Sequence, residues 1–417
     1  MALAVASDLP MLAGPAAASD PPTLYLDACA TTPLAPEVMG AMERAWREAW
    51  ANPSSLHGPG LAAAELLERC RLEVAAHLDA EPEEVVWCSG GTEAIQTALL
   101  GGAAVLEPGR LVISAVEHPA TEAAAAVLAR RGWSVERWPV DRQGLLRLEA
   151  AEALLAPPTR LVSLIWGQSE VGSLQPVAEV GALCRARGIV SHVDAVQVLG
   201  QAPIRWSRLP VDLLSGAAHK LQGPRGIGLL LARRGLALEP LLGGAQERGR
   251  RGGTEPVPLV AGFATALGLR AERLAAHGGT DPIARMRDNL WAELASMSGL
   301  ELLGPPPGDR GRRLPHHLSV LARDPRGRPL SGRALVRALA QLGVACGSGS
   351  ACSARAPGGG GGRGVAGASR VLLAMGYGPE EASAGLRLSL GPWLREGDLA
   401  MVPDALARAM ETVARAR

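Results

Sequence analysis

Short apolar runs alternate along much of the chain with longer stretches in which apolar positions recur at helical spacing. The apolar runs predict strands at Val85–Trp87, Leu111–Val116, Leu161–Trp166, Ile189–Val193 and Ile227–Leu231. The stretches between them predict helices, for example at Thr121–Arg131 and Pro176–Arg187. This alternation is typical of an α/β fold in which helices cover both faces of a mostly parallel sheet.

The pattern changes after about Leu274. A long helical stretch, short apolar runs around Leu314–Val320 and a final helical stretch predict a second, smaller α+β domain. We therefore expect a large domain over residues 34–275 and a small domain made of residues 23–33 and 276–417. Residues 1–22, which are rich in Ala and Pro, are expected to form a flexible tail.

Composition and charge exclude several classes of protein. The formal net charge of +1 leaves no broad basic surface for nucleic acid. No apolar run approaches the roughly 20 residues of a membrane-spanning helix. A signal peptide begins with a basic region, but no Lys or Arg precedes Arg44. The six cysteines are scattered, apart from Cys346 and Cys352, so neither a disulfide framework nor a metal site is expected. A cytoplasmic protein that binds no nucleic acid and no membrane fits best.

Lys220 is the only lysine in a chain that has 42 Lys and Arg residues together. Arginine supplies positive charge, but only an amine can lose its proton and form a Schiff base. A surface lysine that happens to remain is the alternative. Because Lys220 lies in a Gly-flanked segment, we favour a chemical role.

Other candidate residues follow predicted strands, where α/β sheets bind their ligands. Glycines in the run Ser89–Glu93, which opens a predicted helix at Ala94–Leu100, suit a phosphate, although a turn capped by Thr92 is the commoner explanation. The carboxylate of Asp194 suits a protonated heteroaromatic nitrogen or, equally, a helix cap. His118 suits proton exchange, although a lone histidine before a proline is more often structural.

Cys352 lies among Gly and Ser residues, directly before the Gly-rich tract 357–367. A thiol on an accessible loop suits sulfur transfer, because it must first reach a substrate and then present its sulfur to an acceptor. Buried cysteines are usually inert packing, and these neighbours argue against a packed site.

Several short motifs, in order and at compatible spacing from Leu24 to about Trp393, resemble those of the cysteine desulfurases. These enzymes have the class-V aminotransferase fold, and the chain is most similar to the group that supplies sulfur for iron–sulfur cluster assembly. The motifs are Tyr25-Leu26-Asp27 with Ala30-Thr31-Thr32-Pro33, Asn52–His57, Ser89–Glu93, Glu117-His118, His192–Ala195 with Gln197, His219-Lys220 with Gly223–Gly226, Arg251–Thr254, Gly349–Cys352 and Arg387–Gly391.

The resemblance implies a large domain of the fold-type I, pyridoxal-phosphate (PLP) class and assigns roles to single residues. Lys220 is the residue that forms the Schiff base with PLP, and Cys352 is the one that takes sulfur from L-cysteine as a persulfide. Arg387 is the implied partner of the substrate carboxylate. The implied cofactor contacts are Gly91, Thr92 and His219 to the phosphate, Asp194 to the ring nitrogen, Gln197 to the phenolic oxygen and His118 over the ring. Thr254 reaches the phosphate of a neighbouring subunit, which implies a homodimer, and the sulfur goes to a protein acceptor or an iron–sulfur scaffold.

Four features depart from the family pattern. Gln168-Ser169 stands where two asparagines are usual, Ala217 where a phosphate-binding serine is common, and Cys29 where alanine is usual; the loop after Cys352 is also longer. These departures leave two alternatives open: a related lyase, such as a selenocysteine lyase or a cysteine-sulfinate-type lyase, and a catalytically quiet scaffold for sulfur transfer. A nucleotide-binding oxidoreductase is disfavoured, because the Gly-rich run at residues 347–350 does not lie in a βαβ unit near the N-terminus.

Overall fold

The computed structural model describes residues 23–309, 311–349 and 368–416. Its main element is a seven-stranded sheet of order β2-β8-β7-β6-β5-β3-β4. The strands are β2 (Val85–Cys88), β3 (Arg110–Ser114), β4 (Ser134–Trp138), β5 (Thr159–Ile165), β6 (Val190–Asp194), β7 (Leu213–Ala217) and β8 (Gly228–Ala232). Strands β7, β6, β5, β3 and β4 pair in parallel, whereas β8 is antiparallel to both of its neighbours. The predicted α/β class with a mostly parallel sheet is confirmed.

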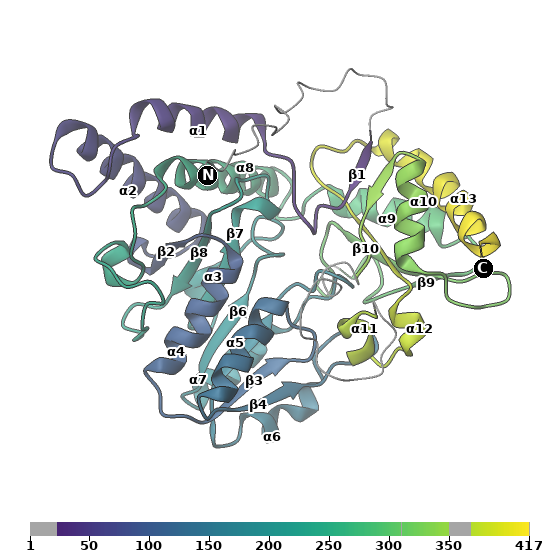
Figure 1. Cartoon of the computed structure of the whole chain (residues 1–417), viewed down its shortest axis with the longest axis horizontal. Coiled ribbons are helices and arrows are strands. Elements are labelled where there is room, and N and C mark those ends of the chain that lie inside the picture. The colour runs from purple at the N-terminus through teal and green to yellow at the C-terminus, as the bar shows by residue number, and fades with distance from the viewer. Residues whose placement is uncertain (1–22, 310, 350–367, 417) are drawn as a thin grey trace, which may run out of the picture.

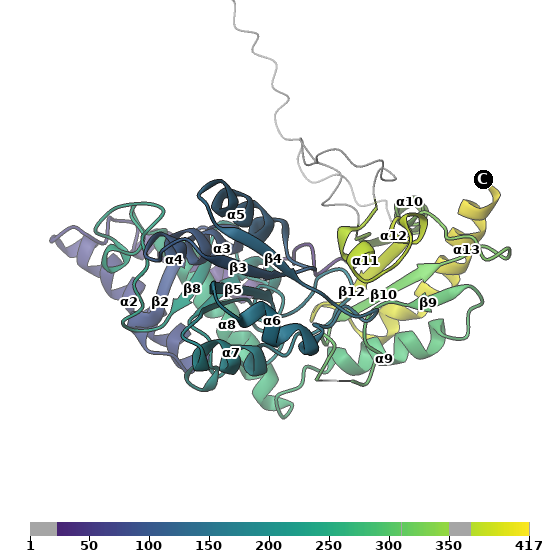
Figure 2. The same ribbon diagram turned by 90° about the horizontal axis from the view of Figure 1, so that it is seen from below.

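Helices cover both faces of this sheet (Figures 1 and 2). One face packs against α3 (Gly91–Gln96) and α5 (Pro119–Arg130). The other packs against α7 (Val177–Ala186) and α8 (Val257–Ala276), with α1 (Pro36–Glu48) and α2 (Gly58–Leu78) lying on α8. Shorter segments connect them: a π-helical turn (Thr97–Gly101) and α4 (Gly102–Ala104) continue α3, and α6 (Ala151–Leu155) precedes β5.

The two faces follow from the side-chain alternation of extended strands. In β2, Val86 and Cys88 lie in the core beneath α3, while Val85 and Trp87 lie in the core beneath α8. All four side chains are buried, so neither face of the strand meets solvent. A strand buried on both faces reads as a continuous apolar run, which is why β2 could be predicted from the sequence.

A second, smaller sheet has the order β12-β10-β9 and is antiparallel (Figure 1). Its strands are β9 (Leu300–Leu302), β10 (His317–Ala322) and β12 (Gly385–Ser389). The surrounding helices are α9 (Ile283–Leu294), α10 (Gly332–Gln341), α11 (Arg370–Ala374), α12 (Pro379–Ala382) and α13 (Val402–Arg415). In addition, β1 (Leu24–Leu26) pairs in parallel with β11 (Val344–Cys346), so the start of the described chain joins its C-terminal part.

The smaller sheet has a hydrophobic core separate from those of the large sheet, and Leu24 and Leu26 belong to it. The largest of these cores also takes in Leu303 and Leu314, so packing alone draws no boundary in the chain. The division between residues 275 and 276 therefore stays a prediction. None of the helices in the described part of the chain has both the length and the apolar character needed to cross a membrane.

Candidate active site

The predicted site residues gather where the parallel strands end. His118 follows β3, Asp194 is the last residue of β6, and Lys220 ends a 3₁₀ turn that follows β7. Gly91 begins α3 immediately beyond β2. Because parallel strands finish at the same edge of a sheet, residues more than a hundred positions apart meet there.

The amine of Lys220 is held by the backbone of the N-terminal segment. Its Nζ donates hydrogen bonds to the carbonyl oxygens of Cys29, at 2.5 Å, and Ala30, at 2.8 Å. The same segment is tied to the lysine turn, because the backbone N–H and hydroxyl of Thr32 both donate to the carbonyl oxygen of His219 at 3.0 and 2.9 Å. The turn after β1 is therefore part of the site.

Asp194 and His118 influence each other electrostatically. Burial raises the pKa of Asp194, while the positive charges of His118 and Lys220 act in the opposite direction. Burial lowers the pKa of His118, whose Nδ1 accepts a hydrogen bond from the backbone N–H of Ala120 at 3.1 Å and so caps α5. One carboxylate oxygen of Asp194 accepts from the backbone N–H of Val196 at 2.9 Å, which fixes the carboxylate at the end of β6.

Gln197 is buried, and only one of the two polar atoms of its side-chain amide has a hydrogen-bond partner among the described atoms. Its amide nitrogen donates to the carbonyl oxygen of Cys29 at 3.0 Å, whereas its Oε1 has no hydrogen-bond partner among the described atoms. A buried polar atom without a partner costs free energy unless a ligand or water completes it. Gln197 therefore marks a polar position that a bound molecule can occupy.

At the start of α3 the helix backbone packs closely against the residues that follow β6. A Cβ atom at Gly91 would lie 2.7 Å from Cγ2 of Val196, so the helix can pack here only with glycine. Thr92 is exposed, one residue into the helix. The first backbone N–H groups of a helix have no partner within it and carry partial positive charge, so this end of α3 favours an anion.

His219 contributes a neutral imidazole. Burial, together with the positive charges of Lys220 and Arg225, lowers its pKa to about 4. Its Nδ1 lies 3.2 Å from the hydroxyl oxygen of Thr31. Near neutral pH it can therefore form hydrogen bonds but supplies no charge.

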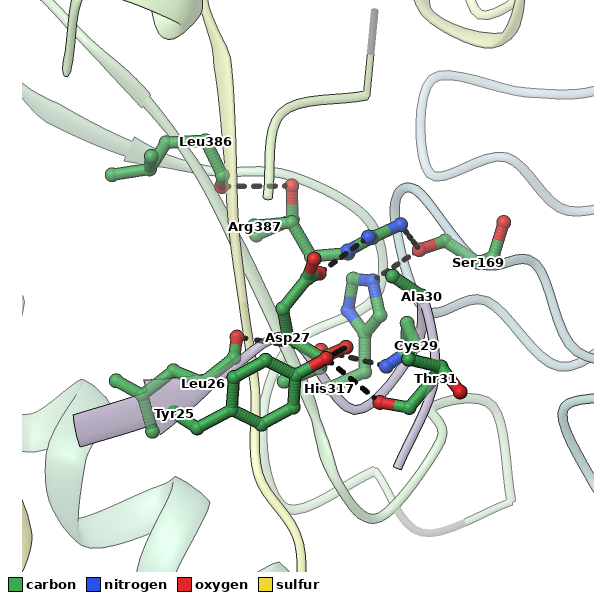
Figure 3. Close-up of polar contacts among 12 residues, drawn as sticks. Tyr25, Leu26, Asp27, Cys29, Ala30, Thr31, Ser169, His317, Leu386 and Arg387 are labelled. Carbon is green, nitrogen blue, oxygen red and sulfur yellow. Dashed lines mark hydrogen bonds and ion pairs between the residues drawn. The ribbon is translucent and has the colours of Figure 1, made fainter. Parts of the chain in front are cut away.

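Arg387 reaches the site from β12 of the smaller sheet (Figure 3). Its Nη2 donates to Oδ1 of Asp27 at 2.7 Å and its Nη1 donates to the carbonyl oxygen of Ser169 at 3.0 Å. Burial lowers the pKa of this guanidinium, but the neighbouring Cys29 and Asp27 raise it more, so it stays charged. Its Nε has no partner among the described atoms. A buried cation with an open donor can bind a carboxylate.

The remaining two predicted residues are Thr254 and Cys352. Thr254 is exposed and lies in the loop that precedes α8. Cys352 and the Gly-rich tract lie outside the described residues. The two flanks of that segment meet at Glu170: the hydroxyl of Ser369 donates to its Oε2 at 2.5 Å, and a side chain at Gly349 would collide with the same carboxylate. Burial raises the pKa of Glu170 to about 7.

The structure also explains one departure from the family pattern. The side-chain amide of Gln168 donates to the carbonyl oxygen of Val116 at 3.1 Å, and its oxygen accepts from the backbone N–H groups of Glu170 and Val171. Gln168 thus fixes the turn after β5 and joins it to the segment before His118. Both polar atoms of its side-chain amide therefore have hydrogen-bond partners within the protein.

Glu117 belongs to the Glu117-His118 motif, and the sequence by itself assigns it no role. Its Oε1 accepts from the hydroxyl of Ser114 at 2.6 Å and from the backbone N–H of Ile165 at 2.7 Å. Ile165 lies in register with Asp194 in the β5–β6 pair. The Glu117 side chain therefore connects the His118 turn to the strand beside Asp194, and burial raises its pKa to about 8. In the sequence, the only indication of this role is an acidic residue directly before His118.

Known proteins resemble this chain over most of its length. The Aminotransferase class-V family matches residues 24–391. A cysteine desulfurase of Rhodobacter capsulatus is 40% identical over 339 residues, which cover 80% of this chain and 85% of the relative. The cysteine desulfurase NifS of Azotobacter vinelandii is 35% identical over 380 residues, which cover 90% of each chain.

A solved structure of a NifS-like protein superimposes with a TM-score of 0.81 at 30% identity, covering 94% of this chain and 100% of that one. The match includes both main sheets, which confirms the fold predicted from the motifs. The family match extends from β1 to the residues after Arg387 and so contains every described site residue. The chain belongs to the class-V aminotransferase family and, within it, to the cysteine desulfurases.

Proposed function

We propose that this protein is a PLP-dependent enzyme that converts L-cysteine to L-alanine and retains the sulfur on Cys352 as a persulfide. The observation that carries the proposal is the position of the only lysine, at the strand edge beside Asp194 and His118. In the reaction the C–S bond of the substrate breaks, an S–S bond to Cys352 forms, and the substrate carbon gains a proton.

The described residues fit the cofactor. The buried carboxylate of Asp194 would suit a protonated ring nitrogen, and the side-chain amide of Gln197, whose oxygen is unpartnered, could form a hydrogen bond to a polar substituent of the ring. Gly91 and the N-terminal end of α3, with Thr92 and the neutral His219, suit a phosphate. When bound, PLP supplies an electron sink for negative charge on the substrate carbon.

The protein's own residues then have separable tasks. Lys220 would hold the cofactor covalently and can exchange protons at its Nζ. In the structure this Nζ donates hydrogen bonds to the carbonyl oxygens of Cys29 and Ala30. His118 would hold the cofactor ring and can exchange protons with the substrate, since burial lowers its pKa and favours the neutral imidazole. Arg387 orients the substrate carboxylate.

We propose a homodimer as the active unit, with Thr254 completing the phosphate site of the neighbouring subunit. Large apolar side chains on α1, on α2 and in the connection between them support this: Met39, Trp46, Trp50, Leu56, Leu61 and Leu72 are all more than half exposed, at 55% or above. A second copy of the chain would cover this surface, which a monomeric protein would rarely leave open. The sulfur acceptor is proposed to be a cytoplasmic protein, such as an iron–sulfur scaffold.

Three measurements on the purified protein test the proposal. An absorption band of a lysine-bound cofactor that changes on addition of cysteine would support the cofactor and the substrate class together. Stoichiometric alanine, with persulfide on the Cys352 peptide by mass spectrometry, would support the reaction. A much faster reaction with selenocysteine than with cysteine would favour the related lyase instead, and protein without cofactor or turnover would favour a scaffold.

A further inference from the structure

Cys29 lies where the N-terminal segment crosses the site, and four polar contacts meet at this residue. Its backbone N–H donates to the hydroxyl oxygen of Ser389 at 2.9 Å. Its carbonyl oxygen accepts from Lys220 at 2.5 Å and from Gln197 at 3.0 Å. Its Sγ lies 3.3 Å from Nε2 of His316. The side chain is only 2% exposed, so no external reagent or protein reaches this thiol directly.

The thiol and the imidazole form a neutral pair. Burial raises the pKa of the Cys29 thiol, although the charges of Arg387 and Lys220 oppose this, and burial lowers the pKa of His316 to about 3. A neutral thiol is a poor nucleophile, so the pair is unsuited to receiving sulfur. The Cys29–His316 pair can instead fix the local backbone conformation, because a hydrogen bond between Sγ and Nε2 joins two buried groups from different parts of the chain.

The surroundings of His316 also indicate that the pair holds a conformation. Its imidazole is 2% exposed, and its Nδ1 has no hydrogen-bond partner among the described atoms. The contact with Cys29 therefore supplies the side-chain hydrogen bond of a buried ring. His316 is itself fixed to β12, because its carbonyl oxygen accepts from the backbone N–H of Leu390 at 2.8 Å. The smaller sheet thus holds Cys29 from two directions, through His316 and through Ser389.

We propose that Cys29 and His316 act as a positioning pair for Lys220. Their contact fixes the carbonyl oxygen of Cys29, and this oxygen sets how strongly the released amine of Lys220 is held in its charged form. The proposal rests on the proposed function, in which Lys220 must lose a proton before it can bond to a carbonyl compound. A carbonyl oxygen that accepts from Nζ favours the ammonium form, so loosening it makes the amine reactive at lower pH.

The other charged and titratable groups around this arrangement stay in place when the pair is altered. The groups that interact electrostatically with Lys220, Cys29 or His316 include Asp27, His118, Asp194, His219, Arg270, Asp281, Arg287, His317 and Arg387. The second carbonyl acceptor of the amine also remains, because the turn at Ala30 is closed by its own backbone hydrogen bond to Asp27 at 2.9 Å. A change in Lys220 reactivity can then be assigned to the Cys29 carbonyl.

The chain offers an unusually clean test, because any lysine-selective reagent reports on Lys220 alone. The full-length protein is treated with such a reagent before PLP is added, over a range of pH, and the labelled peptide is followed by mass spectrometry, which separates it from the N-terminal amine. Cys29→Ala removes the sulfur, and His316→Phe keeps a ring while removing both nitrogens. We expect each to lower the pH of half-maximal labelling by about half a unit, so that labelling below that pH is about threefold faster.

Three further variants make the result specific. The double variant should differ little from either single one, because both remove the same contact. Cys29→Ser keeps a hydrogen-bonding group and should remain close to wild type. Cys184→Ala removes a fully buried thiol on α7 and should leave the labelling profile unchanged, which controls for packing.

Wild-type labelling profiles in both Cys29→Ala and His316→Phe would overturn the proposal, as would an equal shift in Cys184→Ala or fully additive shifts in the double variant. If one of the two variants fails to fold by circular dichroism, the other decides. The assay needs neither cofactor nor cysteine. A protein that binds no PLP would therefore refute the proposed function while the labelling result still stands or falls on its own.

Discussion

Arg387 forms an ion pair with Asp27, with Nη2 of the guanidinium 2.7 Å from Oδ1 of the carboxylate (Figure 3). Its Nη1 is engaged by the carbonyl oxygen of Ser169, which also accepts from Nε2 of His317 at 3.0 Å. A substrate carboxylate can therefore use the unpartnered Nε or share the guanidinium with Asp27. The ion pair fixes the orientation of the guanidinium that we propose binds the substrate carboxylate.

Replacing Arg387 with lysine should raise KM for cysteine by about tenfold or more, with a smaller effect on kcat. Lysine keeps the charge but loses the planar fork that can bind Asp27, Ser169 and the substrate together, and a hydrogen bond to a charged group contributes about 1.5–3 kcal/mol. Steady-state alanine production measures both constants. Arg323→Lys is a matched control, because Arg323 forms ion pairs with Glu301 and Glu381 outside the site. An unchanged KM in Arg387→Lys would remove Arg387 from substrate binding.

The variant Lys220→Arg should retain positive charge yet form no covalent bond to PLP, because a guanidinium does not supply a neutral amine. Borohydride reduction followed by mass spectrometry detects such a bond, and activity should disappear with it. A reducible bond to the cofactor in this variant would place the covalent linkage elsewhere. Since the chain has no other lysine, only the N-terminal amine could then provide it.

The variant Cys352→Ser should bind PLP and cysteine but form no persulfide, because a hydroxyl cannot accept sulfur in this way. Cysteine-induced changes in the absorption spectrum should remain while alanine release is lost. Cys346 is the nearest alternative in sequence, but it is buried in β11 and burial raises the pKa of its thiol to about 12. Persulfide on Cys346 with intact turnover would contradict the assignment of Cys352.

Glu117→Gln should flatten the pH dependence of stability. Burial raises the pKa of Glu117 to about 8 in the folded protein, from about 4.3 in an unfolded chain. Between these values the folded state binds the additional proton, so the free energy of unfolding falls as pH rises, by up to about 1.4 kcal/mol per pH unit. Glutamine keeps an oxygen for Ser114 and Ile165 but cannot ionise.

Urea unfolding of both proteins at several pH values between 5 and 8 measures this difference. The wild type should lose stability relative to Glu117→Gln as pH increases. Parallel curves for the two proteins would mean that Glu117 is ionised in the folded state throughout this range.

Replacing Trp46 and Trp50 with glutamate should weaken the proposed dimer, since these side chains are 60% and 66% exposed on one apolar surface. Charged groups there would have to be desolvated on association. Sedimentation velocity at several concentrations measures the oligomeric state. Met401→Glu, at an exposed apolar residue near the start of α13, is the control and should leave it unchanged. A wild-type protein that sediments as a monomer would contradict the dimer and the role of Thr254.

Much of the large sheet could be predicted because strands such as β2 are buried on both faces and therefore read as continuous apolar runs. Two strands of this sheet, β4 and β7, were not predicted from the sequence. The edge strand β4 exposes Ser134, Glu136 and Arg137, and β7 is interrupted by Ser215 and Gly216, so neither has the composition of a buried strand. The reversed direction of β8 is likewise set by pairing with its neighbours and leaves no mark on its sequence.

The sequence alone determined which chemistry is available, because a single lysine and the motifs around His118, Asp194 and Arg387 restrict the reaction. Only the tertiary structure decided how these groups are held. The acceptor of the Lys220 amine is the backbone of Cys29, 191 positions away, and the partner of Arg387 is Asp27, 360 positions away. Such pairings depend on β1 joining the C-terminal part of the chain and on parallel strands ending at one edge. Sequence spacing carries no record of contacts that only packing creates.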